Sequence, residues 1–451
     1  MSTPELAARH KNRGPLKIVC FIHRLFIACG LALLSHTASA AAGVGTDIHC
    51  PNPPVELGGW RNLQCEYVGA NYSPPGQGHL RPPVMFIWWA NEPGERKVTV
   101  DLQGDPALSA CVAAQSGVIG ELIVRPCMSH WPEQHLYAGM QDWWGAFGGT
   151  NSAGWRIASA IAYAKTTLGS LVAPEKGIAL RGSSAGATAM NTQTPAMATF
   201  PVQQQFVTAY GSRAFTLFFK QGHIYSQDPA TQNAWAGFDI STADWRIAAA
   251  NGSISHIYYA MHGGKNDYQL GAVDTEYFAL CDQHKIACFG TWDQGGHTHS
   301  GEVGVNLPRS LYAGALMDHR LDRMQPVFTQ STANSPLSGL RGHYNLGLSA
   351  DMTNFADAAI LASTYIRYLR HTNMGADLED QPEEATFTYT LRRFQNFEFE
   401  VGEVLNWQVT GTAQSGTVTV TTPGEITIPA ITLPSSHQFW QVLITKPGSG
   451  C

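Results

Sequence analysis

Apolar residues follow two different patterns along the chain, and the first pattern predicts an alternation of strands and helices. Uninterrupted apolar runs are typical of strands buried on both faces, whereas apolar residues recurring at i, i+4, i+7 and i+11 are typical of a helix packed on one side. These patterns predict, in chain order, strands at 84–89 and 120–124, a helix within 151–169, a strand at 177–181, a strand at 254–261, a helix at 272–285 and a strand at 286–289. Such alternation predicts a mostly parallel sheet flanked by helices.

After about residue 326 the pattern changes. From residue 386 apolar side chains alternate with period two, which predicts antiparallel strands, and Gly and Pro residues between the runs supply turns. The alternation predicts a small β-sandwich-like domain at about 385–446. The segment 355–370 is ambiguous, because its alanines favour a helix and its β-branched and aromatic residues favour a strand. We therefore expect a catalytic domain at 41–328, a linker at 329–342 and a C-terminal β-rich domain at 343–451.

The first 40 residues have the features of a secretory signal peptide. Four basic residues precede a short apolar stretch at 21–34, and small residues at 37–40 follow it, which predicts cleavage after Ala40. Arg24 and Gly30 interrupt the stretch, so it is shorter than the roughly 20 apolar residues of a membrane span. Without residues 1–40 the chain keeps 23 basic and 33 acidic residues, a net charge of −10.

Charge and length narrow the classes of function. Charged residues make up only 14% of the 451 residues and form no basic run, so the sequence predicts no nucleic-acid partner. No stretch after the signal has the length and apolarity of a span, which predicts no membrane insertion of the exported protein. The sequence indicates no metal or other cofactor and no particular oligomeric state.

The cysteines fit an oxidising compartment. Seven of the nine cysteines lie outside the signal, and six of these form three pairs that are close in sequence: Cys50 with Cys65, Cys111 with Cys127, and Cys281 with Cys288. We expect these pairs to be disulfides in a secreted or periplasmic protein, although six cysteines allow 15 connectivities. Cys451 has no obvious partner.

One motif carries chemistry. Residues 182–186 read Gly-Ser-Ser-Ala-Gly, the only GxSxG in the chain, between a buried strand and an expected helix. Small flanking residues allow a sharp strand-to-helix turn that exposes the Ser184 hydroxyl. The backbone amide of Ala185 then lies at a helix N-terminus, where it can stabilise an oxyanion.

A serine nucleophile needs a base and an acid that orients the base. Asp267 follows the expected strand at 254–261, at the carboxyl end where open α/β sheets place their sites, and we predict it as the acid. His297 follows the last strand in a glycine-rich loop and is the predicted base, with His299 as the alternative. Asp274 and Asp293 are alternative acids.

These residues resemble the α/β-hydrolase superfamily, in particular its secreted serine esterases and polyester depolymerases. The resemblance covers about residues 80–325 and implies acyl transfer through Ser184, His297 and Asp267. In many members a His-Gly pair after the third strand supplies a second oxyanion amide. The place taken as equivalent here reads Trp88-Trp89-Ala90, so Trp89 or Ala90 is the expected donor.

Substrate class is a further expectation. Aromatic residues at 131–147, notably Trp143 and Trp144, are candidates for lining an acyl or polymer site, although such residues more often belong to a core. We expect hydrolysis of a small or polymeric ester. The alternatives are an exported serine peptidase of the same fold and a non-catalytic polymer-binding protein. The C-terminal domain is expected to brace the catalytic domain or to bind a polymer.

Overall fold

The structure of the protein is a computed structural model that describes eleven parts of the chain. They are residues 48–67, 84–102, 120–126, 153–182, 213–216, 252, 255, 257–264, 276–294, 320–372 and 381–448. The expected signal peptide, Cys111, Cys127 and Cys451 lie outside them. In the described ranges no helix is long and apolar enough to cross a membrane.

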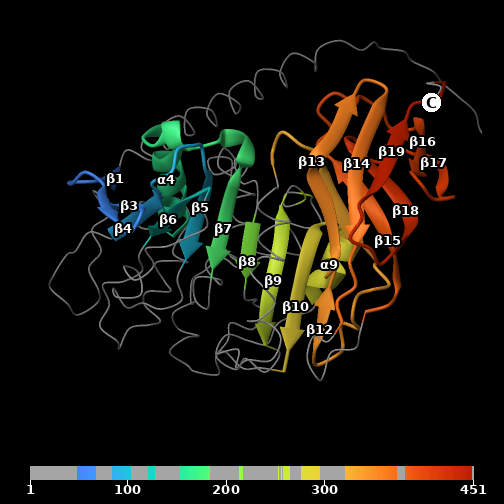
Figure 1. Ribbon diagram of the computed structural model, residues 1–451, viewed down its shortest axis with the longest axis horizontal. Coiled ribbons are helices and arrows are strands. Elements are labelled where there is room, and N and C mark those ends of the chain that lie inside the picture. The colour runs from blue at the N-terminus through green and yellow to red at the C-terminus, as the bar shows by residue number, and fades with distance from the viewer. Residues whose placement is uncertain are drawn as a thin grey trace, which may run out of the picture. The chain divides into compact units, whose positions relative to one another are not determined.

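The largest sheet has eleven strands, and its core is parallel (Figure 1). Its strands are β1 (Ile48–His49), β2 (Val55–Leu57), β3 (Trp60–Tyr67), β4 (Val84–Ala90), β5 (Lys97–Leu102), β6 (Glu121–Pro126), β7 (Ile178–Gly182), β8 (Arg213–Thr216), β9 (Tyr258–Gly264), β10 (Ala287–Asp293) and β12 (Gly342–Tyr344). Their order is β1-β3-β4-β6-β5-β7-β8-β9-β10-β12, with β2 paired to β3. The six strands from β6 to β10 are parallel, and β4 runs antiparallel to both of its neighbours.

Helices and short turns flank this sheet. The described helices are α4 (Ala153–Thr166) and α9 (Glu276–His284), and the described 3-10 turns are η3 (Gly169–Leu171) and η4 (Pro174–Lys176). In α4 the fully buried Ile161 and Ala164 belong to the predicted apolar stripe, and the helix packs on β5 and β6. The expected helices at 151–169 and 272–285 are thus confirmed over the residues that α4 and α9 span.

All paired strands within the C-terminal part are antiparallel. One sheet has the order β11-β15-β18, and another has the order β13-β14-β19-β16-β17. The strands are β11 (Gln325–Thr329), β13 (Leu348–Ala358), β14 (Leu361–Tyr368), β15 (Glu384–Arg392), β16 (Val404–Val409), β17 (Ser415–Thr419), β18 (Glu425–Pro434) and β19 (Trp440–Thr445). The two sheets share one cluster of buried side chains, which includes Phe387, Tyr389, Ile428, Ile366 and Val442. The ambiguous segment 355–370 is therefore strand.

The strands interleave across the expected linker at 329–342. β11 ends at the first residue of this linker but pairs with β15 of the C-terminal part, whereas β12 begins at its last residue but pairs with β10 of the large sheet. The chain thus enters the C-terminal part, returns to the edge of the large sheet, and leaves again for β13. A strand that follows the expected boundary therefore forms the edge of the large sheet.

Two of the three expected disulfides are confirmed. Cys50 is bonded to Cys65, and Cys281 is bonded to Cys288. The first ties the segment after β1 to β3, and the Tyr163 hydroxyl of α4 donates to the Cys50 sulfur at 3.0 Å. The second ties α9 to β10, so both links lie within the part of the chain that forms the large sheet.

Candidate active site

The three strands that precede the predicted catalytic residues end at one edge of the sheet. Arg181 in β7 pairs with Phe215 in β8, which pairs with Ala260 in β9, which pairs with Phe289 in β10. Past this level β7 continues for one residue and β9 and β10 for four residues each, all in the same direction. In Figure 1 the arrowheads of β7, β9 and β10 accordingly point the same way.

The predicted catalytic residues follow these three strand ends in sequence. Ser184 is two residues beyond Gly182, Asp267 is three beyond Gly264, and His297 is four beyond Asp293. Ser184, Ala185, Asp267, His297, His299 and Asp274 themselves lie outside the described residues, as do Trp143 and Trp144. Of the alternative acids, Asp293 is placed as the last residue of β10.

Chain length and strand spacing are compatible with a meeting of the three residues. Neighbouring strands lie about 4.8 Å apart, so β7 and β10, with β8 and β9 between them, are separated by about 14 Å at this edge. The four residues from 294 to 297 span at most about 14 Å when extended. Asp293 also lies three residues, about 10 Å, further along the strand direction than Gly182, so a meeting requires the two residues after Gly182 and the His297 side chain to supply part of the distance.

The predicted oxyanion donors Trp89 and Ala90 lie at the other edge. Trp89 pairs with Leu122, Leu122 with Val98, and Val98 with Ile178, the first residue of β7. Because β4 is antiparallel, its carboxyl end is level with the start of β7, about 13 Å along the sheet from Gly182. The structure therefore places Trp89 and Ala90 away from the strand end that precedes Ser184, which argues against their predicted role as oxyanion donors.

The strand that does end beside β7 is β5, which was not among the expected strands. Leu102, its last residue, pairs with Gly182, and the sequence continues as Gln103-Gly104. A period-two alternation of apolar and polar residues at 97–102, followed by glycine, was the available signal. β5, rather than the strand at 84–89, therefore ends beside Gly182.

A buried ion pair anchors the end of β5. Arg125 of β6 donates through Nε to Asp101 Oδ2 at 3.1 Å, and its Nη2 forms a second hydrogen bond to the same oxygen. The two side chains are 4% and 15% exposed, so the pair is shielded from solvent. The guanidinium also lies over the Trp88 ring, 4.6 Å from its centroid. This arrangement fixes the last residues of β5 immediately before Gln103.

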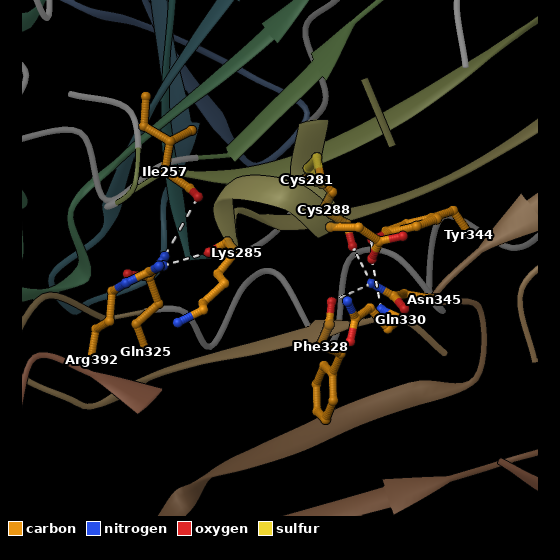
Figure 2. Close-up of a disulfide and its surroundings, with 11 residues drawn as sticks. Ile257, Cys281, Lys285, Cys288, Gln325, Phe328, Gln330, Tyr344, Asn345 and Arg392 are labelled. Carbon is orange, nitrogen blue, oxygen red and sulfur yellow. Dashed lines mark hydrogen bonds between the residues drawn. A yellow bond between two sulfur atoms is a disulfide. The ribbon is translucent and has the colours of Figure 1, made fainter. Parts of the chain in front are cut away.

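The C-terminal part holds the start of β10 through polar contacts (Figure 2). Arg392 of β15 donates to the backbone oxygens of Lys285, at 2.7 Å, and Ser255, at 3.2 Å. Glu425 of β18 accepts from both Lys285, at 2.6 Å, and Arg392, at 2.8 Å. Lys285 stands between α9 and β10, so these bonds connect the C-terminal part to the strand that precedes the His297 loop.

A buried asparagine makes a second connection. The Asn345 side-chain amide donates to the backbone oxygens of Cys288 in β10, at 2.9 Å, and Phe328 in β11, at 2.7 Å. Figure 2 shows Asn345 between these two residues, beside the Cys281–Cys288 disulfide. Asn345 is 3% exposed and has a φ of 53°, a left-handed conformation that asparagine tolerates better than most residues.

The strand order defines the class of the fold. The large sheet is mostly parallel, β4 runs in the opposite direction, β6 and β5 exchange places in the order, and a GxSxG motif follows β7. This is the arrangement of the α/β-hydrolase fold. Among the described residues, no group of three or more His, Cys, Asp or Glu side chains is placed to hold a metal ion.

Comparisons with known proteins give similar solved structures. No family model and no curated protein matches the chain. Esterase B from Lactobacillus rhamnosis is 12% identical, with 65% of this chain and 91% of that chain covered and a TM-score of 0.36. Acetyl xylan esterase 1 from Thermoanaerobacterium is 10% identical, with 63% and 92% covered and a TM-score of 0.37. Brefeldin A esterase, a bacterial homologue of human hormone sensitive lipase, is 10% identical, with 63% and 80% covered and a TM-score of 0.37.

Proposed function

We propose that the protein is a secreted serine hydrolase that cleaves a carboxylic ester through Ser184, His297 and Asp267. The observation that carries the proposal is the common sheet edge. The strands that precede the three residues are parallel members of one sheet, and they end in the chain order serine, acid, histidine of α/β hydrolases. Residues at such strand ends are typical of catalytic sites in open α/β sheets.

The proposed reaction is acyl transfer in two steps. His297 takes the Ser184 hydroxyl proton as the serine oxygen attacks the ester carbonyl carbon, and Asp267 stabilises the imidazolium. His297 then returns the proton to the departing alkoxide, which leaves an acyl-enzyme and an alcohol. Water, deprotonated by His297, attacks the acyl carbon and releases the acid, and the proton returns to Ser184.

The proposed oxyanion hole combines the Ala185 amide with a backbone amide of Gln103 or Gly104. α/β hydrolases take the second donor from the loop after the third strand of the fold. β5 holds that place here, because it lies between β6 and β7 and ends level with Gly182. The buried Arg125–Asp101 pair supports the role by fixing the strand residue just before this segment.

The C-terminal part is proposed to be a β-sandwich that braces the catalytic sheet. Its two sheets share one buried cluster, and its Arg392, Glu425 and Asn345 contact β10 or the residue before it. A brace needs such buried, directional contacts, whereas a tethered polymer-binding domain needs only a linker. Trp143 and Trp144 remain the candidates for the acyl or polymer site.

Labelling with a fluorophosphonate probe tests the proposed nucleophile. We expect one modified residue, Ser184, found by peptide mapping of the folded protein, with labelling lost in Ser184→Ala and reduced at least about 10²-fold in His297→Ala. His299→Ala is the matched control and should label like the parent protein. Loss in His299→Ala with retention in His297→Ala would reassign the base, and an unlabelled, folded protein would overturn the hydrolase proposal.

Substrate panels then separate the activities. We expect turnover of acyl esters or polyester films and none of peptide amides, because amides need stronger protonation of the leaving group. The peptidase reading would be favoured by peptide cleavage at comparable rates. Amino-terminal sequencing of the protein collected outside the cells tests export, with residue 41 as the expected first residue.

A further inference from the structure

The carboxyl end of β10 is held by a second device, built from a buried tryptophan and two glycines. Trp292 is the next-to-last residue of β10 and is fully buried. Its indole Nε1 donates to the Gly339 backbone oxygen at 3.1 Å. Across the strand pair, Trp292 lies opposite Gly342 of β12.

Gly342 is required by the tryptophan ring. A Cβ atom added at Gly342 would lie 2.3 Å from Cζ2 of Trp292 and 2.6 Å from Cβ of Ser335, so no side chain fits there. On its other side the ring packs on Phe278 of α9, with centroids 5.5 Å apart, and Phe278 stacks on Tyr344 of β12 at 4.6 Å. The ring is thus enclosed by the helix before β10 and the strand after it.

The device is distinct from the contacts at the start of β10. Lys285, Arg392 and Asn345 act at or before Cys288, whereas Trp292 acts at the end from which the chain leaves toward His297. Only four residues separate Trp292 from His297, and two of them are glycines. Glycine constrains the backbone weakly, so the strand residues before a glycine-rich loop largely determine where the loop starts and in which direction it leaves the sheet.

We infer that Trp292 is a positioning residue for His297: its indole, fixed by the Gly339 carbonyl and by the glycine at 342, sets the point from which the base reaches Ser184. The inference rests on the proposed function. Misplacement of a catalytic group by about 1 Å can lower a rate about 10²-fold. Loss of the indole donor loosens the anchor without removing the aromatic ring, so a smaller effect is expected.

The test compares Trp292→Phe with a control at the other end of the same strand. Lys285→Met removes the ion pair with Glu425 and is expected to lower the urea midpoint without affecting the base. The second-order rate constant for fluorophosphonate labelling is measured from pH 5 to 9 for the parent protein and both variants. We expect Trp292→Phe to label about 10-fold more slowly, with the acid limb of its pH profile moved to lower pH, because a displaced imidazolium loses stabilisation by Asp267. Lys285→Met should keep the parent rate and profile.

Each result decides one question. Parent-like labelling of Trp292→Phe at every pH, or an equal slowing in both variants, would overturn the positioning role while the proposed function stands. An unlabelled parent protein would overturn both. Should Trp292→Phe fail to fold, Ser335→Ala replaces it, because the Ser335 hydroxyl accepts from the His343 backbone amide of β12 at 3.1 Å and supports the same segment. It should show the same change in the pH profile at a smaller amplitude, and an unchanged profile would count against the inference.

Discussion

Asn345 offers a stability test of how the C-terminal part is joined to the large sheet. Its side-chain amide donates hydrogen bonds to two buried carbonyls on different sheets, those of Cys288 and Phe328. Asn345→Ala removes both donors, and a buried polar group that loses its partner costs about 1–3 kcal/mol. Two carbonyls at the low end of that range give about 2 kcal/mol.

The backbone conformation adds to this cost. At a φ of 53°, alanine costs about 1 kcal/mol more than asparagine, which tolerates the left-handed region. The expected loss for Asn345→Ala is therefore about 3 kcal/mol. Asn345→Gly removes the same hydrogen bonds without the left-handed penalty, but it increases the entropy of the unfolded chain, so it should be about 0.5 kcal/mol less destabilised than the alanine variant.

Urea unfolding with the disulfides intact measures these differences. For a slope of about 3 kcal/mol/M, Asn345→Ala should lower the midpoint by about 1 M. Asn354→Ala is the matched control, because Asn354 also donates a side-chain hydrogen bond, to Asp351, but is exposed. It should change stability by less than about 0.5 kcal/mol. The reasoning is refuted if Asn345→Ala behaves like the control or is more stable than Asn345→Gly.

Three further perturbations test charges and cross-links. Burial alone would raise the pKa of Glu425, but the contacts with Lys285 and Arg392 outweigh burial and lower it. The ionised Glu425 side chain therefore stabilises the folded protein at neutral pH. This stabilisation is lost as the pH falls through the lowered pKa. Glu425→Gln should therefore cost about 2 kcal/mol at pH 7 and less at pH 3 by urea unfolding, and equal losses would contradict this. Burial, with His371 nearby, lowers the pKa of His343 to about 4. The unfolded chain therefore binds more protons than the folded protein between about pH 4 and 6.5. The free energy of unfolding should fall by at most about 3 kcal/mol as the pH drops through that range. His343→Gln should flatten the fall of the thermal midpoint over this range, and an unchanged slope would reject the assignment. Replacing Cys50 and Cys65 by alanine should lower the free energy of unfolding by about 3 kcal/mol, and replacing Cys281 and Cys288 should lower it by about 2 kcal/mol. The first loss is larger because that disulfide closes the longer loop. Urea midpoints measure both losses, and the reverse order would contradict the chain-entropy argument.

Local patterns predicted the central elements because burial dictates them. The apolar run at 84–89 became β4, and the strand at 177–181 became β7 with the GxSxG motif after it. The two confirmed disulfides follow from short sequence separations, which make the partners meet in any compact fold. The strand β5 was missed, because its alternating pattern over 97–102 resembles an exposed edge strand although Val98 and Val100 are fully buried.

The ambiguous segment 355–370 shows why context decides such cases. β14 has alanine at 362 and Ile366 and Tyr368 on its buried face, which joins the cluster shared by the two C-terminal sheets. Alanine favours a helix in isolation, but small side chains also fit between two closely packed sheets. The partner strands β13 and β19 supply the backbone hydrogen bonds, and these partners are distant in sequence.

The direction of a strand could not be read from the sequence, and it changes which residues are proposed as oxyanion donors. An apolar run such as 84–89 has the same appearance whether the strand runs with its neighbours or against them, because burial on both faces does not depend on direction. The reversal of β4 appears only in its pairing with β3 and β6, which are separated from each other by more than 50 residues. Once β4 is reversed, its carboxyl end cannot reach the edge at which β7 ends, and β5 alone of the strands next to β7 on that side supplies a loop there. Pairing beyond the local sequence therefore decides which strand ends lie beside the end of β7. The same holds for β12, whose Gly342 encloses Trp292.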